Sequence, residues 1–206
     1  MQKWLLVLGV LIVIGIGYGL FFNSESTVTN YPSANQGPIV AFGDSLVAGV
    51  GATRENDFVS VVSRELGVPI QNLGQAGDTT RDGLERLDDV LAEKPKLVLL
   101  LLGGNDYLQD IPPAETFANL GTMIESIHDT GAMVVLLGVR GGLFTDSYKQ
   151  EYEVLSKRYQ TAYVPNVLDG LFGNPRYMAD TIHPNDAGYT EIADRVAPVV
   201  NALLQL

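Results

Sequence analysis

Two uninterrupted apolar runs constrain the fold of this chain more than any other feature. Leu97–Leu102 and Met133–Leu137 each contain no polar residue. A strand with one solvated face alternates apolar and polar residues, whereas a strand covered on both faces of a parallel sheet is apolar throughout. Parallel neighbours also need long crossover connections, which are usually helices. The two runs therefore predict a parallel sheet with helices packed on both of its faces.

Other segments complete an alternation of strands and helices. Shorter apolar runs at 39–42, 70–73 and 162–164 are typical of further strands. Apolar residues recur at helical spacing over 58–66, 84–91, 117–127, 148–159 and 189–203. The β-α unit thus repeats along residues 39–206. This order predicts a doubly wound, flavodoxin-like α/β fold with a five-stranded parallel sheet.

The N-terminus carries an apolar segment of a different kind. Residues 4–22 are 19 consecutive uncharged residues, and a helix of that length is about 28 Å long, close to the hydrocarbon thickness of a bilayer. Lys3 precedes the segment and Glu25 follows it, which favours an N-terminus on the cytoplasmic side. We therefore expect residues 1–22 to be a single-pass anchor in the cytoplasmic membrane, with the catalytic domain on its periplasmic or extracellular side. A cleaved signal peptide, which would leave the protein free in the periplasm, is the alternative.

A polar segment separates this apolar stretch from the α/β domain. Residues 23–38 are rich in Ser, Thr, Asn and Pro and show no apolar periodicity. Such a composition predicts a flexible polar tether. The chain is therefore expected to have three parts, namely the anchor (1–22), the tether (23–38) and the α/β domain (39–206).

Composition excludes several classes of function. The formal net charge of −11 disfavours binding to nucleic-acid phosphates. Cysteine is absent, which excludes a disulfide scaffold, a thiolate nucleophile and cysteine-ligated zinc. His128 and His183 are the only histidines, so a histidine-rich metal site is excluded as well. The chain also lacks phosphate-binding glycine motifs after its strands, and we expect no cofactor, no metal and a monomer.

Polar or glycine-rich clusters follow four of the predicted strands. In a doubly wound sheet these positions converge at the carboxyl edge, where such folds bind ligands. The clusters are Gly43-Asp44-Ser45-Leu46, Gly74 to Thr79, Gly103-Gly104-Asn105-Asp106 and Asp180 to Asn185. A serine hydroxyl becomes a strong nucleophile when an imidazole takes its proton and a carboxylate orients that imidazole. Ser45, His183 and Asp180 supply these three groups, and the Ser45 and Gly77 amides and the Asn105 side chain can form an oxyanion hole.

These four blocks resemble the motifs of the SGNH, or GDSL-type, hydrolase family. Within this family the chain resembles the bacterial thioesterase I, lysophospholipase L1 and arylesterase group, and the resemblance extends over nearly all of residues 39–206. The resemblance implies Ser45 as nucleophile, His183 as base and Asp180 as its partner. It also implies an oxyanion hole made by Ser45, Gly77 and Asn105. The expected substrates are acyl or aryl esters or thioesters, lysophospholipids among them.

Some assignments have alternatives at this stage. Asp44, Asp78 and Asp106 remain minor candidates for the partner of the histidine, and His128 is interpreted as structural at a helix end. Alternative functions are a carbohydrate acetyl esterase of the same family, a metal-dependent phosphoesterase and a non-enzymatic anchored binding module. Apolar residues in the loops suggest a substrate groove. Its predicted members are Tyr107, Ile111, Leu143, Phe144 and Tyr177.

Overall fold

A five-stranded parallel sheet forms the centre of the fold in the computed structural model, which describes residues 28–139 and 148–205. The strand order is β2-β1-β3-β4-β5, as expected for a flavodoxin-like doubly wound sheet. The strands are β1 (Ile39–Gly43), β2 (Ile70–Gly74), β3 (Leu97–Leu101), β4 (Met133–Leu137) and β5 (Ala162–Val164). The predicted fold class and all five predicted strands are confirmed.

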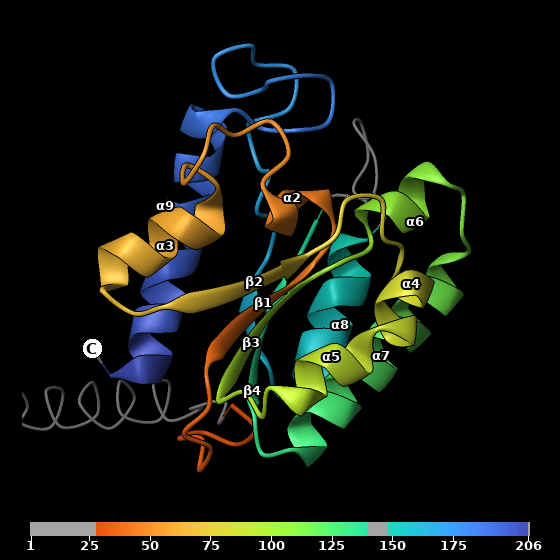
Figure 1. Cartoon of the computed structure of the whole chain (residues 1–206). Coiled ribbons are helices and arrows are strands. Elements are labelled where there is room, and N and C mark those ends of the chain that lie inside the picture. The colour runs from red at the N-terminus through yellow and green to blue at the C-terminus, as the bar shows by residue number, and fades with distance from the viewer. Residues whose placement is uncertain (1–27, 140–147, 206) are drawn as a thin grey trace, which may run out of the picture.

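Helices cover both faces of this sheet (Figure 1). On one face lie α3 (Phe58–Leu66) and α9 (Asp186–Leu204). On the other lie α4 (Thr80–Glu85), α5 (Leu87–Ala92), α7 (Pro113–Asp129) and α8 (Lys149–Tyr159). The short helices α2 (Ser45–Ala48) and α6 (Gly104–Leu108) directly follow β1 and β3. The predicted helix over 84–91 is instead two helices, because the backbone at Arg86 leaves the helical conformation (φ −113°, ψ 14°).

Burial explains why the apolar runs were such a clear signal. Every residue of Leu97–Leu102 has 0% of its surface exposed, and Met133–Leu137 is also buried throughout. β2 lies at the sheet edge and keeps polar residues such as Gln71 and Asn72. Continuous burial on both faces therefore fixes the central strands, and the residues that follow them are held at one edge of the sheet.

Residues 28–38, which we call the N-terminal strap, lie against the opposite end of the sheet. The Asn35 side chain donates to the carbonyls of Pro95 and Thr130, each at 2.9 Å. The Asn30 side chain donates to the carbonyls of His128 (2.8 Å) and Ala132 (2.9 Å). The predicted flexible tether over 23–38 is therefore wrong for residues 28–38, because these amides bind loop and helix-end carbonyls.

The predicted anchor, residues 4–22, lies outside the described residues. Within residues 28–139 and 148–205, no helix combines the length and the apolar character that crossing a membrane requires.

The strap contacts predict a measurable loss of stability in Asn35→Ala. Removing two partly buried hydrogen bonds should lower the free energy of unfolding by about 1–2 kcal/mol. Urea unfolding of the variant and the parent chain measures the difference. Gln36→Ala alters an exposed neighbour and serves as the control. Equal stability of the two variants would contradict the strap as part of the folded domain.

Candidate active site

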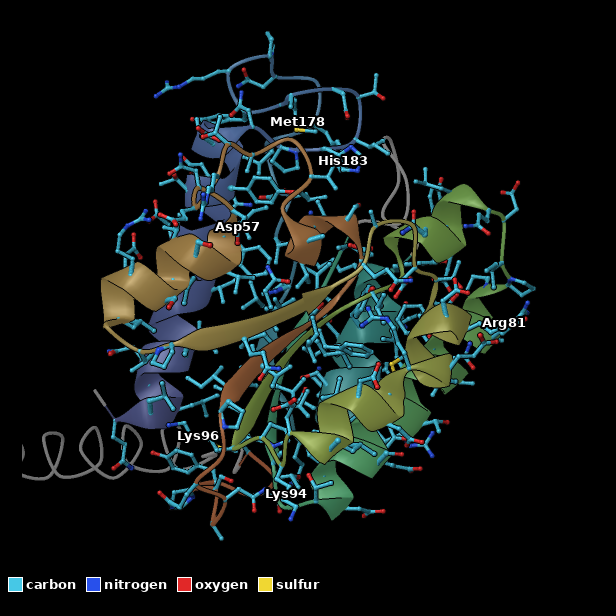
Figure 2. All side chains as sticks on the ribbon, in the orientation of Figure 1. Asp57, Arg81, Lys94, Lys96, Met178 and His183 are labelled. Carbon is cyan, nitrogen blue, oxygen red and sulfur yellow. The ribbon has the colours of Figure 1, made fainter. Side chains whose placement is uncertain are left out.

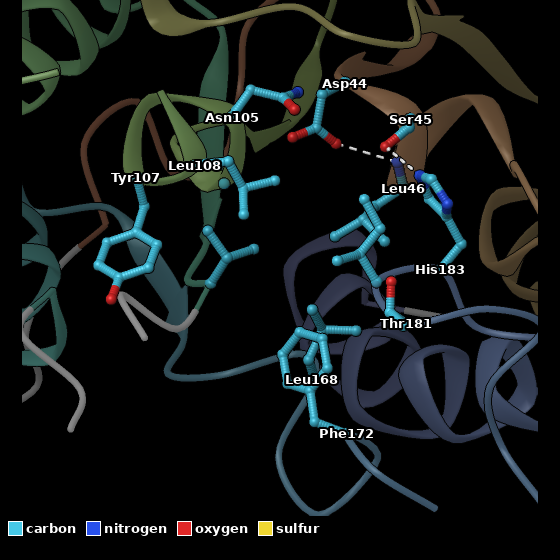
Figure 3. A pocket seen from close by; sticks show the side chains of 13 residues that line it. Asp44, Ser45, Leu46, Asn105, Tyr107, Leu108, Leu168, Phe172, Thr181 and His183 are labelled. Atoms are coloured by element: carbon cyan, nitrogen blue, oxygen red, sulfur yellow. Dashed lines mark hydrogen bonds between the residues drawn. The ribbon is translucent and has the colours of Figure 1, made fainter. Parts of the chain in front are cut away.

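Ser45, His183 and Asp180 form one continuous chain of hydrogen bonds. Ser45 begins α2 directly after β1, and its Oγ lies 3.1 Å from Nε2 of His183. The other ring nitrogen of His183, Nδ1, lies 2.8 Å from Oδ2 of Asp180. Figure 3 shows Ser45 and His183 next to each other on one side of a pocket. Residues that are 138 positions apart in the sequence are thus brought within hydrogen-bond distance.

The loop before α9 orients the imidazole through its own backbone. Oδ1 of Asp180 accepts hydrogen bonds from the amides of Ile182 (2.8 Å) and His183 (2.7 Å), which leaves Oδ2 for the ring. Asn185 caps the N-terminus of α9 and fixes the end of the loop. The hydrogen bond from His183, with those two amides, lowers the pKa of Asp180 to about 2. Asp180 is therefore an anion at neutral pH and can stabilise a positively charged imidazole.

The turn between β1 and α2 is tightly packed. A Cβ on Gly43 would lie 2.1 Å from the Leu101 carbonyl oxygen, so only glycine permits this approach of β1 to β3. Asp44 caps α2 by accepting from the Leu46 amide at 2.9 Å. Its carboxyl group is almost fully buried beside the pocket, and this burial raises its pKa to about 7. Asp44 is thus committed to positioning the helix that carries Ser45.

Arg86 connects the strand ends around this turn. Its guanidinium donates to the carbonyls of Gly43 (2.8 Å) and Leu73 (2.9 Å) and to the Asp78 carboxylate (2.5 Å). It also stacks over the Phe42 ring, with 4.3 Å between Cζ and the ring centroid. One side chain therefore joins the ends of β1 and β2 to the loop that carries Gly77.

The other two predicted oxyanion-hole residues lie beside the same network. The Asn105 side chain donates to the Asp78 carbonyl at 2.8 Å and has a second N–H available. Gly77 has φ +94°, and a Cβ there would meet nothing within 4 Å. Gly77 therefore lies in a left-handed turn, and the space beside its Cα is open.

The alternative partners for the histidine are occupied elsewhere. Asp106 is fully buried and accepts from the Thr80 amide (2.8 Å) and from the hydroxyls of Thr80 (2.5 Å) and Thr116 (3.2 Å). Asp78 pairs with Arg86, and Asp44 caps α2. The carboxylate that binds the imidazole of His183 is that of Asp180.

An apolar pocket of about 480 Å³ opens beside Ser45 and His183. This volume is within the range for small-molecule sites. Apolar side chains from α2, α6 and several loops form most of its wall (Figure 3): Leu46, Tyr107, Leu108, Val139, Leu168, Phe172 and Ile182.

The predicted groove agrees with this pocket only in part. Tyr107 lines it, whereas Ile111 and Tyr177 do not. Ile111 lies where the chain turns towards α7, with its amide bonded to the Asp106 carbonyl, and Tyr177 packs against the core. Leu143 and Phe144 lie outside the described residues. The predicted set lacks the other apolar wall residues, Leu46, Leu108, Val139, Leu168, Phe172 and Ile182. Leu46 and Val139 closely follow buried strands, a position that could have indicated them.

His128 is remote from the site, near the C-terminal end of α7, where its backbone carbonyl holds the strap. Burial lowers its pKa, which agrees with a structural imidazole. Among the described residues, no group of three or more acidic or histidine side chains could hold a metal ion.

The buried carboxyl group of Asp44 predicts a pH-dependent contribution to stability. Its pKa is raised in the folded chain, so between about pH 4 and pH 7 the folded state binds more protons than the unfolded state. The free energy of unfolding should therefore fall, relative to Asp44→Asn, as the pH rises through this window. Urea unfolding at several pH values measures the difference, and Asp194→Asn on the exposed face of α9 is the control. If the difference in free energy of unfolding between the parent chain and Asp44→Asn did not change with pH, the raised pKa of Asp44 would be contradicted.

Comparisons with known proteins agree on one family. The GDSL-like Lipase/Acylhydrolase family profile matches residues 41–190. Esterase TesA of Pseudomonas aeruginosa is 33% identical over 178 residues, which are 81% of this chain and 89% of that protein. The arylesterase of Vibrio mimicus is 34% identical over 171 residues, 77% of this chain and 86% of that protein.

Solved structures agree with the sequence comparisons. The crystal structure of TesA has a TM-score of 0.75 and 32% identity, and the match covers 81% of this chain and 99% of that one. The psychrotrophic esterase EstA from Pseudoalteromonas sp. has a TM-score of 0.72 at 23% identity, covers 83% of this chain and 100% of that one, and supports the fold. This chain belongs to the GDSL-like Lipase/Acylhydrolase family and is an ester-hydrolysing enzyme.

Proposed function

We propose that this enzyme hydrolyses acyl or aryl esters and thioesters through a Ser45–His183–Asp180 triad and an acyl-enzyme. The observation that carries the proposal is the hydrogen-bond chain from Ser45 Oγ through His183 to Asp180, next to an apolar pocket. Ser45 Oγ attacks the carbonyl carbon of the substrate while His183 Nε2 takes the hydroxyl proton. His183 then gives that proton to the departing alcohol or thiol, and an acyl group remains on Ser45. Water, activated by the same nitrogen, releases the acid.

The negative charge that forms on the carbonyl oxygen during the reaction must be stabilised by hydrogen-bond donors. Asn105 can supply its second side-chain N–H, because its first is held by the Asp78 carbonyl. The backbone amides of Ser45 and Gly77 complete the proposed hole. Arg86 and Asp78 hold the two loops in place, so these donors require little rearrangement during the reaction.

The pocket favours an apolar acyl or aryl group. Its wall is mainly aliphatic and aromatic, and it offers few groups that could bind sugar hydroxyls. This observation favours acyl and aryl esters over acetylated carbohydrates. Lysophospholipids and acyl thioesters share the same apolar acyl chain and remain within the proposal.

We also propose that residues 1–22 anchor the enzyme in the cytoplasmic membrane, with the domain on the outer side. The support is the length of the uncharged segment and the placement of Lys3 before it. The domain itself begins at the strap, so a chain that starts at residue 28 should fold and remain active.

The triad predicts large losses of activity from single substitutions. Ser45→Ala and His183→Ala should each lower kcat by about 10⁴-fold or more, because the residues act as one unit. Steady-state kinetics on a p-nitrophenyl ester, with circular dichroism to confirm folding, measures this. His128→Ala removes the other histidine at a remote position and should leave kcat unchanged. A His183→Ala enzyme that kept a tenth of its activity would refute the base assignment.

The oxyanion hole predicts a selective effect of Asn105→Ala. Its amide should meet charge that exists only in the tetrahedral intermediate, so kcat should fall by about 10²–10³-fold with KM little changed. Asn119→Ala removes another side-chain amide, one that donates to Thr80 on the same face of the sheet, and serves as the control. A change in KM alone would place Asn105 in substrate binding.

The pocket predicts the order of substrates. Esters of p-nitrophenol with apolar acyl chains should have higher kcat/KM than the acetate ester, because the apolar wall gains contact with each added methylene. A panel of p-nitrophenyl esters, acyl-CoAs and lysophospholipids, with an acetylated sugar included, tests this. Preference for the acetylated sugar would contradict the proposed substrate class.

A further inference from the structure

The chain enters the folded domain at the end of the sheet opposite the active site (Figure 1). The strap leads into the N-terminal end of β1, whereas Ser45 follows its C-terminal end. We call the end that carries the strap the base of the domain. Lys94 and Lys96 lie at this base, and His183 lies at the far end (Figure 2). Whatever precedes residue 28 therefore leaves the domain on the side away from the pocket.

The entry point is held firmly from its first described residues. The Thr29 amide donates to the Gln160 carbonyl at 2.9 Å, and its hydroxyl donates to the Tyr159 carbonyl at 3.0 Å. Asn30, Ser33 and Asn35 add further bonds along the strap. None of residues 29–35 can therefore lengthen the connection to the N-terminal apolar segment without breaking these contacts.

The connection that remains is short. Residues 23–27 separate the apolar segment from the strap, and fully extended they span at most about 22 Å. A folded domain of this size is roughly 40 Å across. A segment 4–22 held in a bilayer thus keeps the base within reach of that bilayer, and the connection is too short to turn the pocket over onto it.

The charges of the base favour the same orientation. Lys94, Lys96, Lys157 and Arg158 lie there, against Glu65, Glu93 and Asp129. The chain as a whole has a net charge of −11, so most of the acidic residues lie on the other surfaces. Tyr31 of the strap is 42% exposed at this end, and tyrosine is favoured at membrane interfaces. An anionic bilayer therefore attracts the base and repels the remainder of the domain.

We infer that the base docks on the anionic bilayer that anchors the chain, so that the pocket faces away from this bilayer and receives its esters from the aqueous phase. The inference rests on the proposed anchor. It excludes as main substrates the lipids of the same bilayer, which a flexible tether would have brought within reach.

Energy transfer from two matched positions tests the orientation. The chain contains no cysteine, so Ala34→Cys at the base and Ala114→Cys at the N-terminal end of α7 each accept a single donor dye. The 17 residues of α7 separate these ends by about 25 Å. Each full-length variant is inserted into vesicles of phosphatidylethanolamine and phosphatidylglycerol that carry an acceptor lipid. We expect strong transfer from position 34 and weak transfer from position 114. Equal or reversed transfer would overturn the orientation.

Two controls separate the possible failures. Loss of the full-length chain from the vesicles in alkaline carbonate would refute the anchor, and the orientation with it, but not ester hydrolysis. Reversal of base charge in Lys157→Glu/Arg158→Glu should reduce the transfer from position 34, whereas Arg54→Glu, on an exposed arginine at the pocket end, should not. Equal effects of both reversals would contradict docking by the base.

A separate experiment tests whether the enzyme draws its substrate from the bilayer that anchors it. A lysophospholipid is placed either in the vesicles that hold the enzyme or in separate vesicles, at equal total concentration. We expect no faster turnover when enzyme and lipid share a bilayer. Turnover at least tenfold faster in the shared bilayer would overturn the inference while leaving the triad intact.

Discussion

The bonds of the partly buried Arg86 guanidinium hold the geometry of the site together. It binds the last carbonyl of β1, a carbonyl near the end of β2 and the Asp78 carboxylate, and its planar face covers Phe42. Asp78 in turn accepts the Asn105 amide through its carbonyl. The nucleophile turn and both loops of the proposed oxyanion hole are therefore joined through one cation. A lysine could not reproduce these planar, divergent bonds.

The two ends of the sheet have different roles. At the carboxyl end, loops with capped turns place Ser45, His183 and the pocket at the surface. At the amino end, the strap closes the sheet with side-chain amides bound to backbone carbonyls, and Lys94, Lys96, Lys157 and Arg158 lie there. This separation lets the domain be attached at one end without restricting access to the other.

The parts that the sequence predicted are those with a simple physical signature. The central strands were found because burial on both faces makes them continuously apolar, and Ser45, Asn105 and Asp180 because they follow strands or precede the last helix. The strap was missed because Asn30 and Asn35 act through bonds to distant carbonyls, which leave no periodicity. The break at Arg86 was missed because it accompanies hydrogen bonds from that side chain to carbonyls at the strand ends, which leave no sequence pattern. The position of Leu168 in the pocket wall was missed because it depends on loop packing.

Covalent labelling shows whether Ser45 is the nucleophile that His183 activates. A fluorophosphonate reacts with a serine that has been activated by a base, and mass spectrometry of the digested protein locates the adduct. We expect one adduct, on Ser45, formed in step with loss of esterase activity and greatly slowed in His183→Ala. An adduct on another serine, or full loss of activity with Ser45 unmodified, would contradict it.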